Sequence, residues 1–221
     1  MPELLTAAVQ DYVKAIYALD AGGGSVTTTA LAERLDVRPA SVSGMLPKLT
    51  ALGLVEHEPY RGVRLTDRGT RVALEVVRHH RLLELFLVES LGMTWDEVHA
   101  EAEVLEHVLS EELEELIAAK LGDPAFDPHG DPIPSRELIV PADESRSLYA
   151  LEPGERGTFV RISDSDPAML RFLSERGILP GAQLEVVERQ PFDGPLYVRA
   201  GGDVQVHVLG AVLARAMRVT A

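Results

Sequence analysis

The sequence predicts a multidomain protein that is mainly α-helical and ends in a β domain. Apolar residues recur at helical spacing over much of the first 121 residues. Within the first 65 residues, signals for helix, turn, helix and hairpin follow one another in the order of a winged helix-turn-helix. From about Ser147 the pattern changes to short strands with glycine-containing turns. We therefore expect three domains, at residues 1–73, 74–145 and 146–221.

The first domain is predicted to contain three helices and a two-stranded hairpin. Three glycines end the first helix, a threonine run can cap the second, and Pro39 suits the first turn of the third. Pro47 lies inside the third helix and removes a backbone hydrogen bond, so we expect a kink or early loosening there. The expected elements are Leu4–Leu19, Ala30–Leu35, Pro39 to about Leu52, Leu54–Glu58 and Val63–Leu65.

In this arrangement the third helix is a recognition helix for the DNA major groove. The net charge of −14 argues against nucleic acid as a partner, but residues 1–75 carry only −1, which leaves them free to approach a polyanion. A small helical domain with ordinary surface arginines is the alternative. The candidate DNA contacts are Arg38, Ala40, Ser41, Ser43 and Lys48 on the helix, and Arg61 and Arg64 on the hairpin.

The middle segment is predicted to hold three helices and a proline-rich connection. Thr66 can cap a long helix to Leu91, and a capping box at Thr94 starts a helix that continues to about Leu109. A third helix follows, and then a stretch rich in Pro, Gly and Asp at residues 122–145. The apolar faces of these helices suit either a dimer interface or an intramolecular core.

One stretch of this segment, from His99 to His107, carries several ionisable residues. On a single helix, His99, Glu103, Glu106 and His107 share one face. Such a face is either solvated or one side of a divalent-metal site. The chain has no cysteine, so any metal must be held by nitrogen and oxygen ligands. Residues 76–145 carry a charge of −13, which concentrates the acidity around this stretch.

Groups on two earlier helices support the interpretation as a metal site. His80 and Glu84 lie four residues apart on the preceding helix, so both side chains reach one spot. Asp11 is an acid on the first helix among apolar or small neighbours. The remaining histidines have no comparable partners in the sequence and are expected to be surface or structural residues: His57, His79, His129 and His207.

The last segment alternates apolar and polar residues in five short runs. The turns between them contain glycine, which is typical of a small β-barrel. The expected strands are Thr158–Ile162, Gln183–Val187, Leu196–Ala200, Val204–Val208 and Arg215–Thr220.

Other protein classes fit the sequence less well. No uncharged apolar stretch is long enough to cross a bilayer, and Met1-Pro2-Glu3 lacks the basic start of a signal peptide. We therefore expect a cytoplasmic protein with no membrane partner. A carboxylate-bridged metalloenzyme is the rival function. Ferritin-like di-iron sites need Glu-x-x-His on two helices, however, and this chain has no such pair and no His-Glu-x-x-His motif, so we do not expect an enzyme.

Five segments, in order along the chain, carry a resemblance to known proteins: residues 11–17, 38–43, 60–66, His80-Arg81-Leu82-Leu83-Glu84, and Val98-His99 through Glu106-His107-Val108. Together they resemble the diphtheria toxin repressor family of metal-dependent transcriptional regulators, especially its manganese-sensing branch. Residues 127–134 also look like the proline-rich connection of that family, and the C-terminal barrel is similar to the SH3-like, FeoA-like domain of its longer members. The resemblance therefore covers nearly the whole chain.

The resemblance implies a homodimeric regulator, expected to be a repressor, that binds double-stranded operator DNA in response to metal and controls genes of metal-ion homeostasis. Activation of those genes stays open as an alternative. The implied primary metal site consists of Asp11, Glu103, Glu106 and His107. The implied ancillary site consists of His80, Glu84, His99 and an acid from the barrel, for which Asp166 is the best match and Asp164 the next.

Three positions refine these expectations. In the iron-sensing branch, methionine and cysteine stand at the positions of Asp11 and Glu103, whereas this chain has two carboxylates. Carboxylates are hard ligands that favour Mn(II) over softer ions, so we expect Mn(II), with Fe(II) as the alternative. Lys14 stands where short manganese regulators place a glutamate, so their close-spaced pair of metal ions is not expected.

Overall fold

The computed structural model describes residues 5–20, 25–58, 62–163, 166–202 and 204–221. They form two compact units. The first contains the described residues of Met1–His80 together with Leu105–Ser110 and Pro134–Ile139. The second contains those of Arg81–Val104, Glu111–Ile133 and Val140–Ala221. The three-domain division at residues 73 and 145 stays a prediction.

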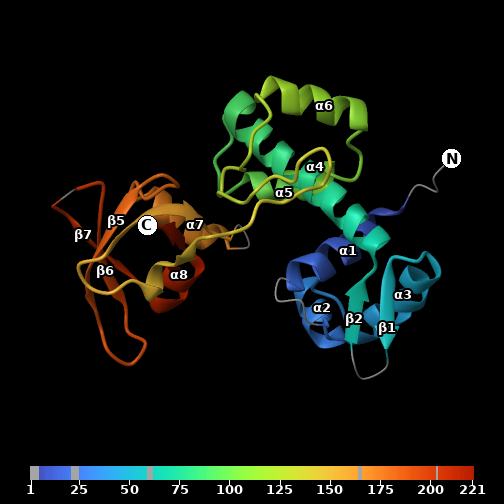
Figure 1. Cartoon of the computed structure of the whole chain (residues 1–221), viewed down its shortest axis with the longest axis horizontal. Coiled ribbons are helices and arrows are strands. Elements are labelled where there is room, and N and C mark those ends of the chain that lie inside the picture. The colour runs from blue at the N-terminus through green and yellow to red at the C-terminus, as the bar shows by residue number, and fades with distance from the viewer. Residues whose placement is uncertain (1–4, 21–24, 59–61, 164–165, 203) are drawn as a thin grey trace. The chain divides into compact units, whose positions relative to one another are not determined.

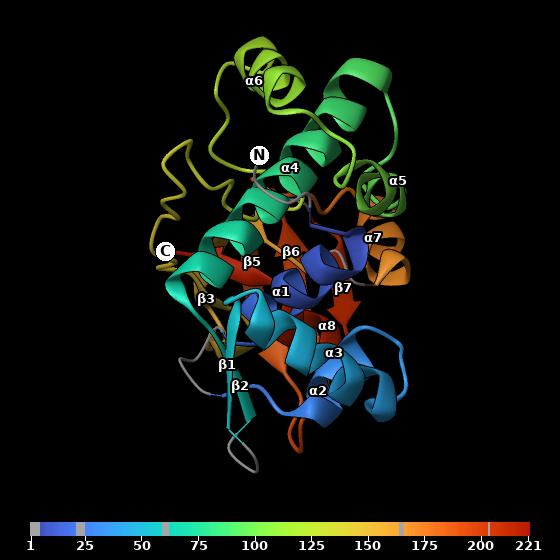
Figure 2. The same cartoon turned by 90° about the vertical axis from the view of Figure 1, so that its right-hand side faces the viewer.

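The first unit has the predicted winged helix-turn-helix. The hairpin lies between α2 and α3 in the view of Figure 1 and to the left of the three helices in Figure 2. Its strands pair antiparallel, with Glu56 opposite Arg64. Val26 adds a bridge to Val63. The elements are α1 (Ala7–Leu19), α2 (Thr28–Arg34), α3 (Pro39–Ala51), β1 (Val55–Glu58) and β2 (Gly62–Leu65).

One hydrophobic core holds these elements together. Helix α1 contributes Val13 and Ile16, and α3 contributes Val42, Leu46 and Leu49, all almost fully buried. Burying a side chain of this size stabilises a fold by about 1.5–3 kcal/mol. Since α1 and α3 share this core, a displacement of α1 disturbs the seating of α3.

Local signals fix most helix ends where the sequence predicted them. Thr27 Oγ1 accepts a hydrogen bond from the Ala30 amide (3.1 Å), which caps α2. Thr66 Oγ1 accepts from the Gly69 amide (3.0 Å) at the start of α4, which spans Asp67–Leu91. The early loosening expected at Pro47 is wrong, since α3 continues to Ala51, whereas the alternative, a kink, stays a prediction. The carbonyl that loses its backbone donor is that of Ser43, an exposed residue, so water can reach it.

The first helix after α4 is shorter than predicted. Helix α5 spans Val98–Leu105 and α6 spans Glu111–Lys120. Thr94 Oγ1 does donate to Glu97 Oε2 (2.8 Å), but residues 95–97 form a turn, so α5 begins only at Val98. Among the helices of the described residues, none combines the length and apolar character that crossing a bilayer requires.

The C-terminal part of the second unit is a six-stranded antiparallel sheet in the order β3-β8-β4-β5-β6-β7. It confirms the predicted β domain at the end of a mainly helical chain. The strands are β3 (Arg146–Ser147), β4 (Arg156–Arg161), β5 (Gln183–Arg189), β6 (Leu196–Ala200), β7 (Val206–Leu209) and β8 (Arg218–Thr220).

Three short helices of this β domain were not predicted. They are η1 (Leu148–Ala150), α7 (Pro167–Ser174) and α8 (Ala211–Ala216). The strand expected at Arg215–Thr220 is therefore too long, since its first two residues belong to α8.

The chain between α4 and α5 and the proline-rich connection both attach to the β domain. Trp95 belongs to the same hydrophobic core as Ile162. The Ile162 amide donates to the His129 carbonyl at 3.0 Å. Gly130 has a φ of +86°, and a Cβ there would lie 1.8 Å from the Val160 carbonyl oxygen. Only glycine fits this close backbone contact.

Candidate metal centre and nucleic-acid interface

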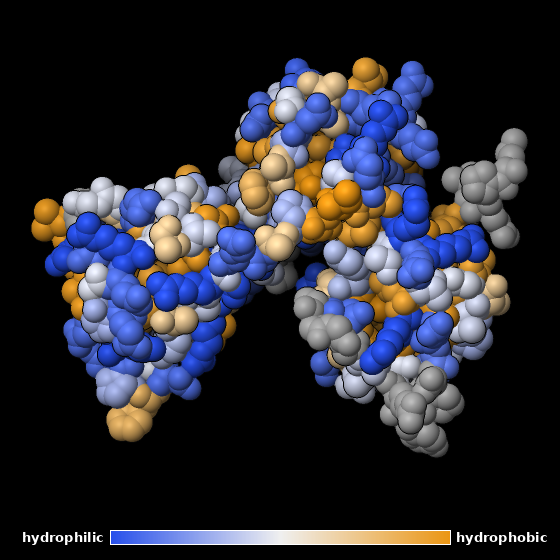
Figure 3. All heavy atoms as spheres, in the orientation of Figure 1, coloured by the Kyte–Doolittle hydropathy of each residue, from blue (hydrophilic) through white to orange (hydrophobic). Residues whose placement is uncertain are grey.

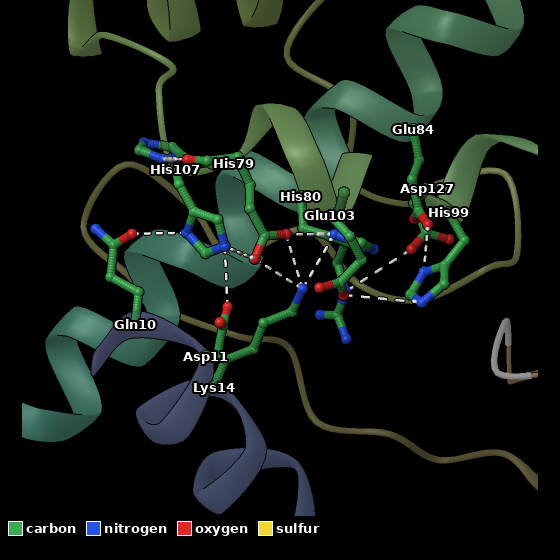
Figure 4. A network of polar contacts seen from close by, with 12 residues as sticks. Gln10, Asp11, Lys14, His79, His80, Glu84, His99, Glu103, His107 and Asp127 are labelled. Atoms are coloured by element: carbon green, nitrogen blue, oxygen red, sulfur yellow. Dashed lines mark hydrogen bonds and ion pairs between the residues drawn. The ribbon is translucent and has the colours of Figure 1, made fainter. Parts of the chain in front are cut away.

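Helix α1 separates its side chains into an apolar face and a polar face. Val13 and Ile16 are fully buried in the core, whereas Asp11 and Lys14 are only partly buried. Figure 4 shows Asp11 and Lys14 pointing from α1 towards His107 and His80. The helix therefore joins the core of the winged helix-turn-helix to a group of ionisable side chains.

Within the first unit, Asp11, Glu106 and His107 form a cluster suited to a metal ion. One ligand atom from each lies within 4.8 Å of the others. His107 Nε2 is 2.9 Å from Asp11 Oδ1 and 3.7 Å from Glu106 Oε1. The other ring nitrogen, Nδ1, lies 2.7 Å from Gln10 Oε1, which holds the ring in place. These three residues were predicted together, and the structure brings them together.

Glu106 and His107 do not lie on the helix that was predicted to continue to about Leu109. Helix α5 ends at Leu105, and Glu106 and His107 lie in the turn that follows. The amides of Val108 and Leu109 both bond to the Leu105 carbonyl, which closes this turn. In this turn Glu106 contacts Lys14 of α1, and His107 contacts Asp11 of α1.

Lys14 occupies a central place among these groups. Its Nζ donates to Glu106 Oε2 at 2.7 Å and to Oε1 at 3.0 Å, and it lies 3.1 Å from His80 Nδ1. His80 Nδ1 is in turn 2.5 Å from Glu106 Oε2. The Glu106 side chain is fully buried and that of Lys14 is 17% exposed. The positive charge of the Lys14 ammonium group thus offsets part of the free-energy cost of burying the charged Glu106 carboxylate.

The other predicted ligands of the helical segment lie in the second unit. Glu84 Oε1 is 3.2 Å from His99 Nδ1, as expected for the ancillary site. Glu103 Oε1 is 3.8 Å from His99 Nε2, so within this unit Glu103 faces a residue of the other predicted site. His80 belongs to the first unit, where it contacts Glu106. The division of ligands between primary and ancillary sites stays a prediction.

The barrel ligand proposed from the sequence has a different role in the structure. The Asp166 carboxylate accepts a hydrogen bond from the Ala168 amide (2.9 Å) and caps α7. No cluster of metal-ligating groups among the described residues includes Asp166. Asp164, the second choice, lies outside the described residues.

The sequence missed a second buried cluster, formed by Glu84, Asp127 and His129. His129 was expected to be a surface or structural residue without a partner, but its Nδ1 lies 3.5 Å from Glu84 Oε2 and its side chain is fully buried. Asp127 Oδ1 accepts hydrogen bonds from the amides of His129 (2.8 Å) and Asp131 (2.9 Å). The signal in the sequence was a histidine flanked by two aspartates in the proline-rich connection.

Burial and neighbouring charge shift the ionisation of this second cluster. Burial raises the pKa of Asp127, and the Glu84 and Asp131 carboxylates raise it further. Burial lowers the pKa of His129, but its hydrogen bond to Glu84 and the charges of Glu84 and Asp127 raise it by more. Because both pKa values are raised, Asp127 and His129 tend to keep their protons beside Glu84.

The predicted DNA contacts of α3 lie together on an exposed surface. Arg38 is the N-cap residue, and Val42, Leu46 and Leu49 turn the opposite face of the helix into the core. Arg64 is exposed on β2, and Arg61 lies outside the described residues. The exposed residues of α3 and its N-cap include Arg38, Ala40, Ser41, Ser43 and Lys48.

The ligand chemistry of the first cluster fits a divalent cation. Asp11 and Glu106 supply carboxylate oxygens and His107 supplies an imidazole nitrogen. Carboxylates suit Mg, Ca and Mn, while imidazole suits Zn, Cu, Fe and Ni, so the mixed set fits a first-row metal of the hard or borderline type.

Comparisons with known proteins decide the family. The N-terminal DNA-binding domain of iron-dependent repressors matches residues 4–63, their metal-binding and dimerisation domain matches residues 66–135, and the FeoA domain matches residues 146–221. The chain belongs to the iron-dependent (diphtheria toxin) repressor family. It is thus a metal-dependent transcriptional repressor rather than an enzyme, and the FeoA match confirms the SH3-like β domain.

Individual relatives resemble this repressor over most of its length. The iron-dependent repressor IdeR is 33% identical over 202 residues in Mycobacterium tuberculosis and 37% identical in Mycobacterium leprae, covering 86% of this chain and 87% of the relative in each case. Among solved structures, a manganese-dependent transcriptional repressor in complex with manganese is 45% identical with a TM-score of 0.90, covering 96% of this chain and 99% of that one. ScaR with bound Zn²⁺ is 30% identical with a TM-score of 0.81, covering 96% and 98%.

Proposed function

We propose that this repressor is activated by Mn(II) and controls genes of metal-ion homeostasis, with Fe(II) as the alternative activator. The observation that carries the proposal is the cluster of Asp11, Glu106 and His107, which offers two carboxylates and one imidazole. No sulfur ligand from cysteine is available to it, since the chain has none. Hard oxygen ligands favour Mn(II), although geometry and metal supply decide among divalent ions of similar size.

Two metal sites are part of this proposal. The primary site consists of Asp11, Glu106 and His107, with Glu103 as its fourth residue. The ancillary site consists of His80, Glu84 and His99, with Asp166 as the barrel ligand carried over from the sequence resemblance. The 3.2 Å contact of Glu84 with His99 supports the ancillary pair.

The geometry suggests how the primary site influences DNA binding. Asp11 lies on α1, whereas Glu106 and His107 lie in the turn after α5. A divalent cation held by Asp11, Glu106 and His107 would supply positive charge to these two carboxylates. Asp11 and His107 then hold α1 against the turn, and α1 shares a hydrophobic core with α3. Metal and DNA thereby favour one arrangement, so each strengthens the binding of the other.

Two further partners belong to the proposal, double-stranded operator DNA and a second copy of the chain. The family has a dimerisation domain, matched here by residues 66–135. Within the second unit, large apolar side chains of the helices are exposed, and Figure 3 shows hydrophobic atoms among the hydrophilic surface of this region. They suit a homodimer interface. These residues are Leu91, Val104, Leu113 and Leu116.

Replacing Arg38 by alanine is expected to weaken operator binding about tenfold. Arg38 is exposed at the start of the recognition helix, where it can contact a phosphate. Losing one phosphate contact lowers the slope of log affinity against log salt concentration by about one. Fluorescence anisotropy with labelled operator DNA at several salt concentrations measures both. Lys120→Ala, at the exposed end of α6, is the control, and an unchanged salt slope in Arg38→Ala would contradict the placement of α3 on DNA.

The proposed function is tested by anaerobic titration of the protein with Mn(II), Fe(II) and Zn(II) in the presence of DNA from upstream of its own gene. We expect Mn(II) to induce binding at the lowest free concentration. The Glu103→Ala variant is expected to lose this dependence, whereas Glu101→Ala, an exposed glutamate of the same helix, retains it. Binding by the wild-type protein without metal would contradict the proposal, and normal switching of Glu103→Ala would remove Glu103 from the primary site.

A further inference from the structure

The imidazole ring of His107 lies between two side-chain oxygen atoms of α1. Its Nε2 is 2.9 Å from Asp11 Oδ1, and its Nδ1 is 2.7 Å from Gln10 Oε1. Figure 4 shows the ring with one of these contacts on each side. Nε2 also lies 3.7 Å from Glu106 Oε1, so this nitrogen faces the candidate metal cluster, whereas Nδ1 faces Gln10.

The two ring nitrogens have different tasks if His107 is a metal ligand. To hold a metal ion, Nε2 must present its lone pair, so it carries no proton. The neutral ring then has its proton on Nδ1, and this proton needs an acceptor. The Gln10 side-chain oxygen is an acceptor, and its 2.7 Å distance from Nδ1 is that of a hydrogen bond. Gln10 thus favours the tautomer whose Nε2 lone pair faces Asp11 and Glu106.

The backbone of the turn that carries His107 is held by other groups. The turn is closed by hydrogen bonds to the Leu105 carbonyl, and His79 Nδ1 of α4 lies 3.2 Å from the Glu106 carbonyl oxygen. Because a carbonyl oxygen only accepts, His79 is the donor in this contact. These contacts fix where the turn lies, but they do not fix the rotation of the His107 ring. The contact with Gln10 fixes that rotation on the Nδ1 side.

Gln10 is placed by a helix that is firmly packed. Its neighbours Val9 and Val13 on α1 are almost fully buried in the core of the winged helix-turn-helix. The Gln10 side chain itself is partly buried. A movement of α1 therefore moves two groups together: Asp11, a ligand of the proposed primary site, and Gln10, which holds the ring of another ligand.

We propose that Gln10 is a positioning residue for His107, through which α1 sets the ring orientation and the tautomer of this metal ligand. The inference rests on the proposed function, because it requires that His107 binds metal through Nε2. Groups that accept from the second nitrogen of a ligating histidine orient its ring, and their loss weakens metal affinity about 10- to 100-fold. The affinity of the primary site thus depends on α1 twice, through Asp11 and through Gln10.

Two substitutions at Gln10 separate hydrogen bonding from shape. Methionine in Gln10→Met has a similar length but offers Nδ1 only a weak acceptor. Glutamate in Gln10→Glu has nearly the same shape as glutamine and keeps an oxygen acceptor, as found behind many ligating histidines. Gln190→Met is the matched control, because Gln190 is also a partly buried glutamine and its side-chain amide donates to Glu188 (2.6 Å) in the β domain.

Calorimetric titration of the full-length protein with Mn(II) measures both classes of site. We expect Gln10→Met to weaken the primary class about tenfold and to leave the ancillary class unchanged, which also shows that the variant is folded. Gln10→Glu is expected to keep or exceed the wild-type affinity, and Gln190→Met to match it. Primary binding by Gln10→Met at the wild-type affinity would overturn the proposal. An equal loss in Gln10→Glu would overturn it as well, because the acceptor would then be irrelevant.

Nuclear magnetic resonance of the Zn(II)-loaded protein tests the tautomer directly, since Zn(II) has a filled d shell and is diamagnetic. In nitrogen-edited spectra of the imidazole groups, the wild-type His107 ring is expected to carry its proton on Nδ1, in slow exchange with water. This signal is expected to broaden or disappear in Gln10→Met. A wild-type ring with its proton on Nε2 would overturn the proposal whether or not the variants fold. The Asp11→Asn variant separates this inference from the proposed function: if it leaves the primary binding class intact, the metal-site assignment itself is wrong.

Discussion

Replacing Glu106 by glutamine is expected to abolish metal-dependent operator binding. Glu106 is fully buried, contacts Lys14 and His80, and lies beside His107 in the candidate metal cluster. Glutamine has nearly the same shape but lacks the negative charge, so we expect metal affinity of the primary site to fall more than about 100-fold. Calorimetric titration with Mn(II), together with anisotropy of labelled operator DNA, measures both consequences.

Glu101→Gln is the matched control, because Glu101 lies on α5 and is exposed. It is expected to bind metal and operator as the wild-type protein does. Thermal unfolding of the metal-free proteins shows whether Glu106→Gln is folded. If folded Glu106→Gln still responds to Mn(II) at wild-type concentrations, the carboxylate is not a ligand and the cluster is an ion-pair network only.

The winged helix-turn-helix could be predicted from sequence because its boundaries depend on local chemistry. Thr27 and Thr66 bond to amides three residues ahead, so their capping role requires no distant partner. Gly53 adopts a φ of +68° and ends α3 for a reason that is equally local. Pro47 does not end α3 early, because the buried residues on both sides of it hold the helix together despite the missing hydrogen bond.

The metal cluster could be predicted only in part, since it depends on contacts between distant segments. Spacing placed Glu106 and His107 on one helical face, but in the structure a turn carries them to α1. Lys14 was expected only to prevent a second metal ion, and its bond to Glu106 joins residues 92 positions apart. No pattern within one helix indicates which distant carboxylate an ammonium group will meet.

The β domain shows the same division between local and distant information. The Asp166-Pro167 pair is a recognisable helix start, with an aspartate cap and a proline in the first turn, and it could have indicated α7. The contact of His129 with Glu84 could not have been found this way, because it depends on the β domain holding residues 127–131 against α4.

Replacing Lys14 by methionine is expected to strengthen Mn(II) binding at the primary site about tenfold and to lower the free energy of unfolding of the metal-free protein by about 2 kcal/mol. The Lys14 ammonium donates to both oxygens of Glu106, which a metal ion also needs. Removing it frees these oxygens for metal, but leaves a fully buried carboxylate without its cationic partner. Calorimetric titration measures the affinity, and urea unfolding in the presence of a chelator measures the stability.

Lys120→Met is the matched control, because this lysine is exposed at the end of α6 and is expected to change neither quantity. The two effects of Lys14→Met have opposite consequences for regulation. Tighter metal binding lowers the Mn(II) concentration at which operator DNA is bound, whereas wild-type Lys14 keeps the unliganded repressor stable and raises that concentration. If Lys14→Met instead binds Mn(II) more weakly than the wild-type protein, then Lys14 assists the metal site, and its ammonium is not a competitor for Glu106.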